Sequence, residues 1–228
     1  MKLGKRLKQI ESMVTAKYDH IWDCCCDHGL VGAALLSRQA APYIHFVDIV
    51  PELTKQLKSK LFRFYPHNSE SISRSQWHVH CMNVSALPLH EFNGKHLIII
   101  AGVGGDLMTE FVKEIFQRYP TADIDFLLCP VHHQFALRQQ LIKFNFGLHT
   151  EALISENHRF YEILLVSTTS SCLTISPVGN LIWQSNTPEG FKNVTDYLNK
   201  TLAHYHRIQL NCQPEVQLII DAYKAVAI

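Results

Sequence analysis

Short apolar runs alternate with amphipathic segments over the first two thirds of the chain. The runs have the length of strands, whereas the segments between them repeat apolar residues every three or four positions, as a helix does. Alternating strands and helices predict a parallel sheet with helices on both faces. The expected strands are residues 20–24, 43–48, 77–81, 96–101 and 124–129, and the expected helices are residues 3–15, 51–62, 107–118 and 133–143, with another starting after residue 29.

Two more apolar runs, residues 148–155 and 160–167, are separated by only a short turn. So short a connection joins antiparallel strands, because parallel neighbours need a long crossover. The chain is therefore predicted to form an α/β fold with a Rossmann-like, doubly wound sheet, mostly parallel, with an antiparallel edge hairpin.

The pattern changes after residue 167. A Ser/Thr-rich stretch is followed by helical spacing of apolar residues over residues 188–223, which Pro214 divides in two. We expect two domains: a sheet domain at residues 1–167 and a small helical hairpin, resembling a coiled coil, at residues 168–228.

Composition indicates a folded globular protein with almost no net charge. The chain has 228 residues, 47% of them hydrophobic and 18% charged, and its net charge is +1. Any nucleic-acid-binding surface must therefore be local. The basic N-terminus lacks the long apolar segment of a signal peptide, and no apolar run is long enough to span a bilayer. We expect a cytoplasmic protein, monomeric by default and not associated with membranes, whose seven cysteines are reduced thiols.

The segment at residues 21–36, IWDCCCDHGLVGAALL, combines a strand, a tight turn and the start of a helix. Asp23 lies near the end of the strand, and Asp27, His28 and Gly29 follow in the turn. In open α/β sheets, the loop after the first strand holds a nucleotide-like cofactor against the helix N-terminus. This segment is thus the candidate cofactor site.

Asp48 closes the second strand, about 20 residues beyond the turn, which is where such folds place the partner of a ribose hydroxyl. The spacing alone fits NAD, FAD or S-adenosylmethionine (SAM). The acid inside the first turn, the lack of a GxGxxG match and the final strand hairpin favour SAM and disfavour a dehydrogenase. An α/β domain with no ligand is the alternative.

A glycine-rich loop, Gly102, Val103, Gly104 and Gly105, follows the apolar run HLIIIA. Without side chains, such a loop lets a ligand approach the backbone, although it is also typical of a simple helix start. Clusters such as His78, His80 and Cys81, or His132 and His133 near Cys129, lack the CxxC or HExxH spacing of zinc sites. We expect no metal.

Five segments together carry a more specific similarity: LGKRL near the start, DxxxDHG at residues 23–29, IIIAGVGG at 98–105, the strand end at Pro130, and HRFYEILLV at 158–166. With these motifs the chain resembles the bacterial TrmK family, the tRNA (adenine(22)-N1)-methyltransferases, over nearly its whole length. The resemblance implies a class I SAM-dependent methyltransferase domain, a C-terminal coiled-coil-like domain and tRNA as the substrate.

The resemblance also implies roles for single residues. The turn would line the methionine part of SAM, Asp48 would hold the ribose, and the glycine loop would lie beside the sulfonium. Asn83 stands where the family usually has an aspartate facing the adenine, and its amide oxygen can still accept that hydrogen bond. The implied cofactor-binding residues are Asp23, Cys25, Asp27, His28, Gly29, Asp48, Ile49, Asn83, Val84, Ala101, Gly102, Gly104 and Gly105.

Methylation of adenine N1 requires mainly positioning, because N1 has an in-plane lone pair that can attack a sulfonium methyl directly. The base must first be turned out of folded RNA. A carboxylate, Asp27 or Asp106, would stabilise the charge left on the ring or accept a proton from N6, and His28 would orient a ligand. Asp106 is equally what a helix dipole favours in a first turn, and His28 is alternatively a packing residue.

Substrate contacts are expected from Lys5 and Arg6 and from the strand end at Cys129, Pro130 and Val131. The family typically has Gln and Asn at the positions of Cys129 and Val131, and usually glycine at that of Cys25. These departures motivate the alternatives of a SAM- or RNA-binding protein of the same fold without methyl transfer, or of a methyltransferase with another substrate.

Basic residues that are candidates for RNA contact occur in three groups, and the simpler reading of each is a solvated helix face. They are Lys2, Lys5, Arg6 and Lys8; Lys55, Lys58, Arg63 and Arg138; and Lys192, Lys200, His204, His206 and Arg207.

Overall fold

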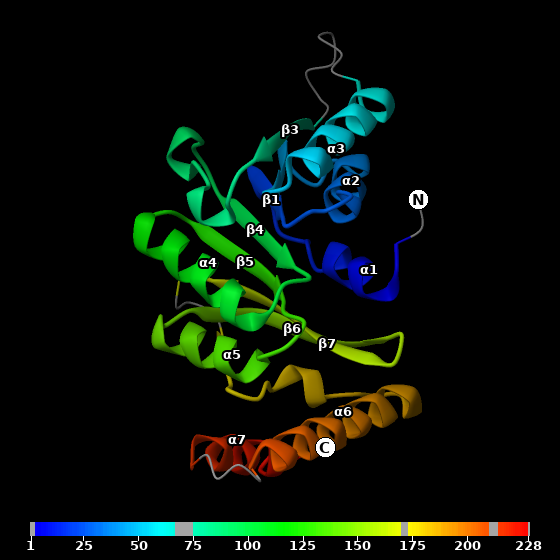
Figure 1. Ribbon diagram of the computed structural model, residues 1–228, viewed down its shortest axis with the longest axis vertical. Helices are drawn as coiled ribbons and strands as arrows, with labels where there is room; N and C mark the ends of the chain where they lie inside the picture. Colours follow the sequence, from blue (N-terminus) through cyan, green and yellow to red (C-terminus); the bar gives the residue numbers. More distant parts are fainter. Residues whose placement is uncertain (1–2, 67–74, 170–172, 210–213, 228) are drawn as a thin grey trace.

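The computed structural model describes residues 3–66, 75–169, 173–209 and 214–227, and it contains one eight-stranded sheet (Figure 1). The strand order is β3-β2-β1-β4-β5-β7-β6-β8. Strands β1 to β5 pair in parallel, and β6 and β7 form an antiparallel hairpin, as the sequence predicts. The short β8, which was not predicted, pairs antiparallel with β6. The strands are β1 (His20–Cys24), β2 (Tyr43–Asp48), β3 (Gln76–Cys81), β4 (His96–Ala101), β5 (Ile124–Cys129), β6 (Gly147–Glu156), β7 (Arg159–Ser167) and β8 (Leu173–Thr174).

Helices cover both faces of the sheet (Figure 1). One face packs against α1 (Lys5–Ser12), α2 (Leu30–Ser37) and α3 (Pro51–Phe64), and the other against α4 (Gly105–Arg118) and α5 (Gln134–Lys143). Strand β4 shows why: Leu97 and Ile99 point into one core and Ile98 and Ile100 into the other, all fully buried. A continuous apolar run is what a central parallel strand requires.

The first helix is shorter than its apolar periodicity predicts, and it ends at Ser12. Arg38, at the end of α2, donates from Nη2 to the backbone oxygens of Glu11 (3.1 Å) and Val14 (2.7 Å). These bonds satisfy carbonyl groups that would otherwise be unpaired where a helix ends. Met13 and Val14 then turn into the core instead of continuing the helix.

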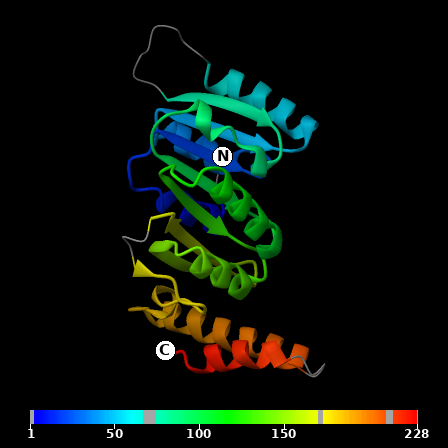
Figure 2. The ribbon, with the colours of Figure 1, turned by 90° about the vertical axis from the view of Figure 1, so that its left-hand side faces the viewer.

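After β7 the chain does not leave the sheet at once, because β8 pairs with β6 and Ile175 is buried in the sheet core. The 3₁₀ turn η3 (Leu181–Trp183) follows, and then α6 (Pro188–Gln209) and α7 (Pro214–Lys224) form the predicted helical hairpin. The two helices lie side by side beyond β6 and β7 (Figure 2). The domain division at residue 167 remains a prediction.

Arg138 of α5 is fully buried, which rules it out as the RNA contact that the sequence suggested. Its guanidinium forms 2.7 Å ion pairs with Glu151 of β6 and Glu162 of β7. Glu162 also accepts a hydrogen bond from the hydroxyl of Tyr197 on α6. Two carboxylates around one guanidinium offset part of the cost of burying charge, and the hydroxyl bond attaches the helical hairpin to the sheet.

A chain of hydrogen-bonded histidines crosses β1, β2 and β3. His20 donates from Nε2 to the backbone oxygen of Asn93 (3.2 Å), so its Nδ1 accepts from Nε2 of His45 (3.1 Å), and Nδ1 of His45 accepts from Nε2 of His80 (3.0 Å). The ring of His45 also stacks on Trp22, with centroids 3.8 Å apart. His20 and His45 must be neutral, because each ring serves as both donor and acceptor.

Burial and the neighbouring histidines lower the pKa of His45 from 6.5 to about 2. Below pH 6.5 the unfolded chain therefore binds a proton that the folded protein excludes. The free energy of unfolding should fall by about 1.4 kcal/mol per pH unit below about pH 6 from this group alone. Urea unfolding between pH 7.5 and 5 measures the slope. His45→Gln, whose amide can donate and accept but does not titrate, should flatten it; identical slopes in both proteins would contradict the assignment.

The described cysteines Cys24, Cys25, Cys26, Cys81 and Cys129 are all unpaired. Cys172, Cys212 and Lys2 lie outside the described residues. Within the ranges given above, no helix combines the length and the apolar character that crossing a membrane requires.

Candidate functional site

The turn between β1 and α2 lies at the carboxyl ends of the parallel strands. Cys25, Asp27 and Gly29 have positive φ angles of 54°, 47° and 67°. Left-handed backbone is costly for residues other than glycine and is kept where a site requires it. The sequence raised the question of whether a Cβ fits at Cys25, and the structure accommodates this half-buried side chain against the sheet core.

Helix α2 approaches the sheet closely at Gly32. A Cβ at this position would lie 2.4 Å from the ring of Phe46 and 2.9 Å from Oδ2 of Asp23. The Gly32 N–H instead donates to that oxygen (2.8 Å). The absence of a side chain therefore brings the N-terminus of α2 against the buried carboxyl of β1.

Asp48 ties the turn to the end of β2. Its Oδ2 accepts from the backbone N–H of Asp27 (3.0 Å) and its Oδ1 from that of Val50 (3.0 Å). Each carboxylate oxygen keeps a second lone pair, so the group can still accept bonds from ligand hydroxyls. The next residue, Ile49, leaves 64% of its apolar side chain exposed, which offers a flat ligand a surface to cover.

Burial raises the pKa of Asp23 to about 7, with a smaller contribution from the negative charge of Asp48, while the Gly32 N–H opposes the shift. Burial also raises the pKa of Cys25 to about 11 and that of Cys129 to about 12. The two thiols are thus protonated at neutral pH and unsuited to act as nucleophiles.

Asp23, Cys25 and Asp27 line a cavity of about 280 Å³. Asp48, Ile49 and Cys129 are not among its lining residues. Its glycine loop is open, because a Cβ at Gly102 would meet nothing within 4 Å. Buried and exposed carboxyl groups on one side and bare backbone on the other suit a small cationic ligand. The lining comprises Arg6, Leu7, Asp23, Cys24, Cys25, Cys26, Asp27, His28, Leu30, Val31, Ala101, Gly102 and Val103.

Arg6 enters this cavity from α1. Its guanidinium carbon lies 4.9 Å from the centre of the Tyr161 ring, and its Nε is buried with no hydrogen-bond partner among the described residues. A guanidinium is always charged and presents a fork that matches carboxylate and phosphate. Arg6 is therefore the group in this cavity that can receive an anion.

Other predicted residues lie outside the cavity. Val84 is 4% exposed and belongs to the core under α4, so its side chain is unavailable to a cofactor. Asn83 caps the 3₁₀ turn η1 (Val84–Ala86) by accepting the Ser85 N–H (2.9 Å). Cys129 is fully buried, so its side chain cannot touch a substrate, and Lys5 is exposed at the start of α1.

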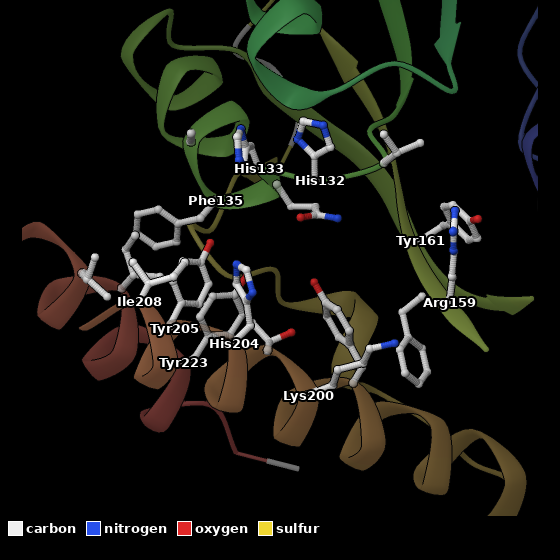
Figure 3. Close-up of a pocket in the computed structure, with 18 of the residues that line it drawn as sticks. His132, His133, Phe135, Arg159, Tyr161, Lys200, His204, Tyr205, Ile208 and Tyr223 are labelled. Carbon is white, nitrogen blue, oxygen red and sulfur yellow. The ribbon is translucent and has the colours of Figure 1, made fainter. Parts of the chain in front are cut away.

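A second cavity, the interdomain groove, runs between the sheet and the helical hairpin and has a volume of about 570 Å³ (Figure 3). Figure 3 shows His132 and His133 on the sheet side, opposite His204 and Tyr205 of α6. Aromatic and basic side chains predominate in the lining, which includes Val131, His132, His133, Phe135, Arg159, Phe160, Tyr161, Lys200, His204, Tyr205 and Tyr223.

Backbone hydrogen bonds join the loop after β4, which lines the first cavity, to the loop after β5, which lines the groove. The Val131 N–H donates to the Val103 oxygen (3.0 Å), and the Gly105 N–H donates to the His132 oxygen (2.9 Å). The His132 ring lies so close to Gly104 that a Cβ there would be 2.4 Å away. The loop after β5 is thereby fixed against the glycine loop, with one cavity on either side.

A comparison with protein families shows the family to which the chain belongs. Residues 3–164 match the family model described as a methyltransferase domain. The chain belongs to this methyltransferase family. The matched region runs from α1 to β7 and contains the first cavity and the glycine loop.

Solved structures similar to this methyltransferase extend the match to the helical hairpin. TrmK of M. capricolum, in complex with S-adenosylhomocysteine, is 17% identical with a TM-score of 0.76 over 98% of this chain and 97% of that one. Sp1610 of Streptococcus pneumoniae, described as a putative tRNA (m1A22) methyltransferase, is 19% identical with a TM-score of 0.73 over 98% and 97%. TrmK of B. subtilis is 18% identical with a TM-score of 0.66, again over 98% and 97%. At this identity the likeness establishes a shared fold, and no curated protein sequence matches the methyltransferase.

The sequence placed Asp23, Asp27 and His28 of the methyltransferase at the cofactor and Arg6 at the substrate, and all four line the first cavity. Their roles remain predictions. The groove was not predicted from the sequence. The signal available was the HRFY stretch, whose Arg159, Phe160 and Tyr161 line it, but nothing in the sequence indicated that α6 would lie opposite. Among the described residues, no three His, Cys, Asp or Glu side chains are placed to hold a metal ion.

Proposed function

We propose that this methyltransferase transfers a methyl group from SAM to N1 of an adenine in tRNA, in the cytoplasm. The observation that carries the proposal is the extent of the structural likeness. The TrmK structures match 98% of the chain, including the helical hairpin, whereas magnesium protoporphyrin IX methyltransferase of Synechocystis, which is 14% identical with a TM-score of 0.52, matches 71%. The part of the fold that matches enzymes named for tRNA thus includes the helical hairpin.

The first cavity would hold SAM. When bound, SAM supplies an electrophilic methyl group on a positively charged sulfur. Asp48 would accept bonds from the ribose hydroxyls, and Ile49 would cover the adenine. Asp23 and Asp27 would face the ammonium and sulfonium charges, and the Gly102 backbone leaves room beside the methyl group.

Arg6 would bind an anion in the first cavity, either the carboxylate of SAM or the phosphate of the target nucleotide. Its neighbour Tyr161 lines the groove, so a phosphate could reach the guanidinium from the RNA side. In the groove itself, Nζ of Lys200 lies over the Phe160 ring, 5.6 Å from the ring centre. Cations beside exposed aromatic rings suit an unpaired RNA segment, whose bases stack and whose phosphates need positive charge.

The reaction needs little chemistry from the protein, because adenine N1 is already nucleophilic. The residues of the site would bind the two reactants, orient N1 toward the methyl group and exclude water. Asp106, exposed in the first turn of α4 at the groove, would stabilise the positive charge that methylation leaves on the adenine ring.

Incubation of the protein with methyl-labelled SAM and an unmodified tRNA mixture tests the proposal. Label should enter tRNA, and digestion to nucleosides should recover it as 1-methyladenosine. Label in another nucleoside would overturn the adenine assignment. Measurable SAM binding without any transfer to tRNA would favour the alternative of a SAM-binding protein that has lost the reaction, which the side chains of Cys129 and Val131 motivate.

The pKa of Asp23 near 7 gives the binding of SAM a pH dependence. A cationic ligand is attracted by the ionised carboxyl, so affinity should fall by up to about eightfold between pH 7.5 and 6 as Asp23 takes up a proton. Isothermal titration calorimetry with SAM measures it. Asp23→Asn keeps an acceptor for the Gly32 N–H and should bind weakly, with this dependence removed. Equal pH dependence in both proteins would contradict the role of Asp23.

A further inference from the structure

His133 and Asp106 form a hydrogen-bonded pair that the sequence did not reveal. The two residues are 27 positions apart, yet Nδ1 of His133 lies 2.6 Å from Oδ2 of Asp106. A carboxylate can only accept, so Nδ1 carries the hydrogen. In the neutral ring the lone pair is then at Nε2, on the far side of the imidazole from Asp106.

The backbone fixes this pair in place. His133 is the N-cap residue of α5 and has a left-handed φ of 60°, and Asp106 lies in the first turn of α4. The Gly105 N–H donates to the His132 oxygen, and a Cβ at Gly105 would lie only 2.6 Å from the His133 oxygen. The two helix starts are therefore in close contact. The pair is thus set by two rigid elements.

The pair is also accessible to a ligand. The His133 side chain is 53% exposed and that of Asp106 is 66% exposed, and both line the interdomain groove. The loop that carries them is bonded to the glycine loop of the first cavity through Val131 and Val103. A base that enters the groove can therefore reach this pair.

We propose that Nε2 of His133, fixed as an acceptor by Asp106, binds the exocyclic amino group of the target adenine; this rests on the proposed function and deepens it. The contact distinguishes bases. Adenine presents an N–H donor beside its nucleophilic nitrogen, whereas guanine presents a carbonyl oxygen that would face the lone pair of His133. His133 contacts the substrate, and Asp106 is a positioning residue that acts through it.

The pair also favours the methylated state. Once N1 carries the methyl group, the positive charge spreads over the ring and the amino group becomes a stronger donor. The hydrogen bond to His133 strengthens accordingly, and the carboxylate of Asp106 stabilises the charge through the imidazole. No proton has to be transferred to the protein, because the ring retains its hydrogens and the charge.

The test compares two substrates on the full-length protein. The target adenine is first located from the methylated product, and a second tRNA is assembled with purine ribonucleoside at that position, which keeps N1 but lacks the amino group. For the wild-type protein, loss of the amino group should lower kcat/KM by about tenfold. His133→Phe should be about tenfold less active on adenine and should distinguish the two tRNAs less than the wild type does, because only the lower nucleophilicity of purine N1 then separates them.

Asp106→Asn removes the carboxylate that fixes the tautomer and should show an intermediate loss with reduced discrimination. His158→Phe is the matched control, since His158 is also exposed and has a left-handed φ of 61°, and it should behave as the wild type. If the His133→Phe protein still discriminates tenfold between the two tRNAs, the inference is wrong although methyl transfer stands. If the wild type methylates no adenine in tRNA, both the proposed function and the inference are overturned.

Discussion

Replacing Asp48 with alanine is expected to weaken the binding of SAM by about a hundredfold. The two ribose hydroxyls of SAM would lose their acceptor, and each lost charge-assisted hydrogen bond contributes about 1.5 kcal/mol to binding. The change also removes the acceptor for the N–H groups of Asp27 and Val50, so the turn loses its tie to β2. Calorimetric titration with SAM measures the affinity.

Two variants separate the ligand contact from a general effect. Asp48→Asn retains one acceptor oxygen and should fall between the wild type and Asp48→Ala. Glu52→Ala removes a nearby exposed carboxylate from the first turn of α3 and should change the affinity less than twofold. Unchanged affinity in Asp48→Ala, with an intact fold by circular dichroism, would refute the assignment of the ribose site.

Replacing Arg138 with methionine should destabilise the protein by about 3–5 kcal/mol. The change leaves the carboxylates of Glu151 and Glu162 buried without a counter-charge. Glu151 would still accept the N–H groups of Asn180 and Leu181, but among the described residues Glu162 would keep only the hydroxyl of Tyr197. Urea unfolding, followed by circular dichroism, measures the loss.

Arg118→Met is the matched control, because Arg118 is exposed in the last turn of α4 and its loss should cost less than about 0.5 kcal/mol. The triple variant that also changes Glu151 and Glu162 to glutamine should recover much of the stability, since no buried charge remains. A loss in Arg138→Met no larger than that in Arg118→Met would contradict the structural role of the buried ion pairs.

The fold was predictable because its signals are local. The apolar run at β4 and the Pro214 break between α6 and α7 each mark an element in a few consecutive residues. Strand β8 was missed because two residues carry no periodicity. The buried role of Arg138 was also invisible, since an arginine in an amphipathic helix looks the same whether it faces solvent or two carboxylates from strands that are distant in sequence.

The candidate site was predictable only where its residues share a turn. Asp23, Asp27 and His28 are neighbours in the chain, and Asp48 follows at a spacing that parallel sheets impose. The pair of His133 and Asp106 depends on the contact between two helix starts, and the groove depends on where the hairpin docks. Of the histidines on β1, β2 and β3, only His78 and His80 of β3 were considered from the sequence, and only as metal ligands. Strand register instead placed them in a row of stacked rings.

The most direct test of the central claim is a primer-extension map of tRNA treated with the protein. N1-methyladenine blocks the pairing edge of the base and stops reverse transcriptase. We expect a stop at one adenine that requires both SAM and the wild-type protein and is lost with Asp48→Ala. An unchanged map from a protein that binds SAM would contradict methylation of adenine N1 in tRNA.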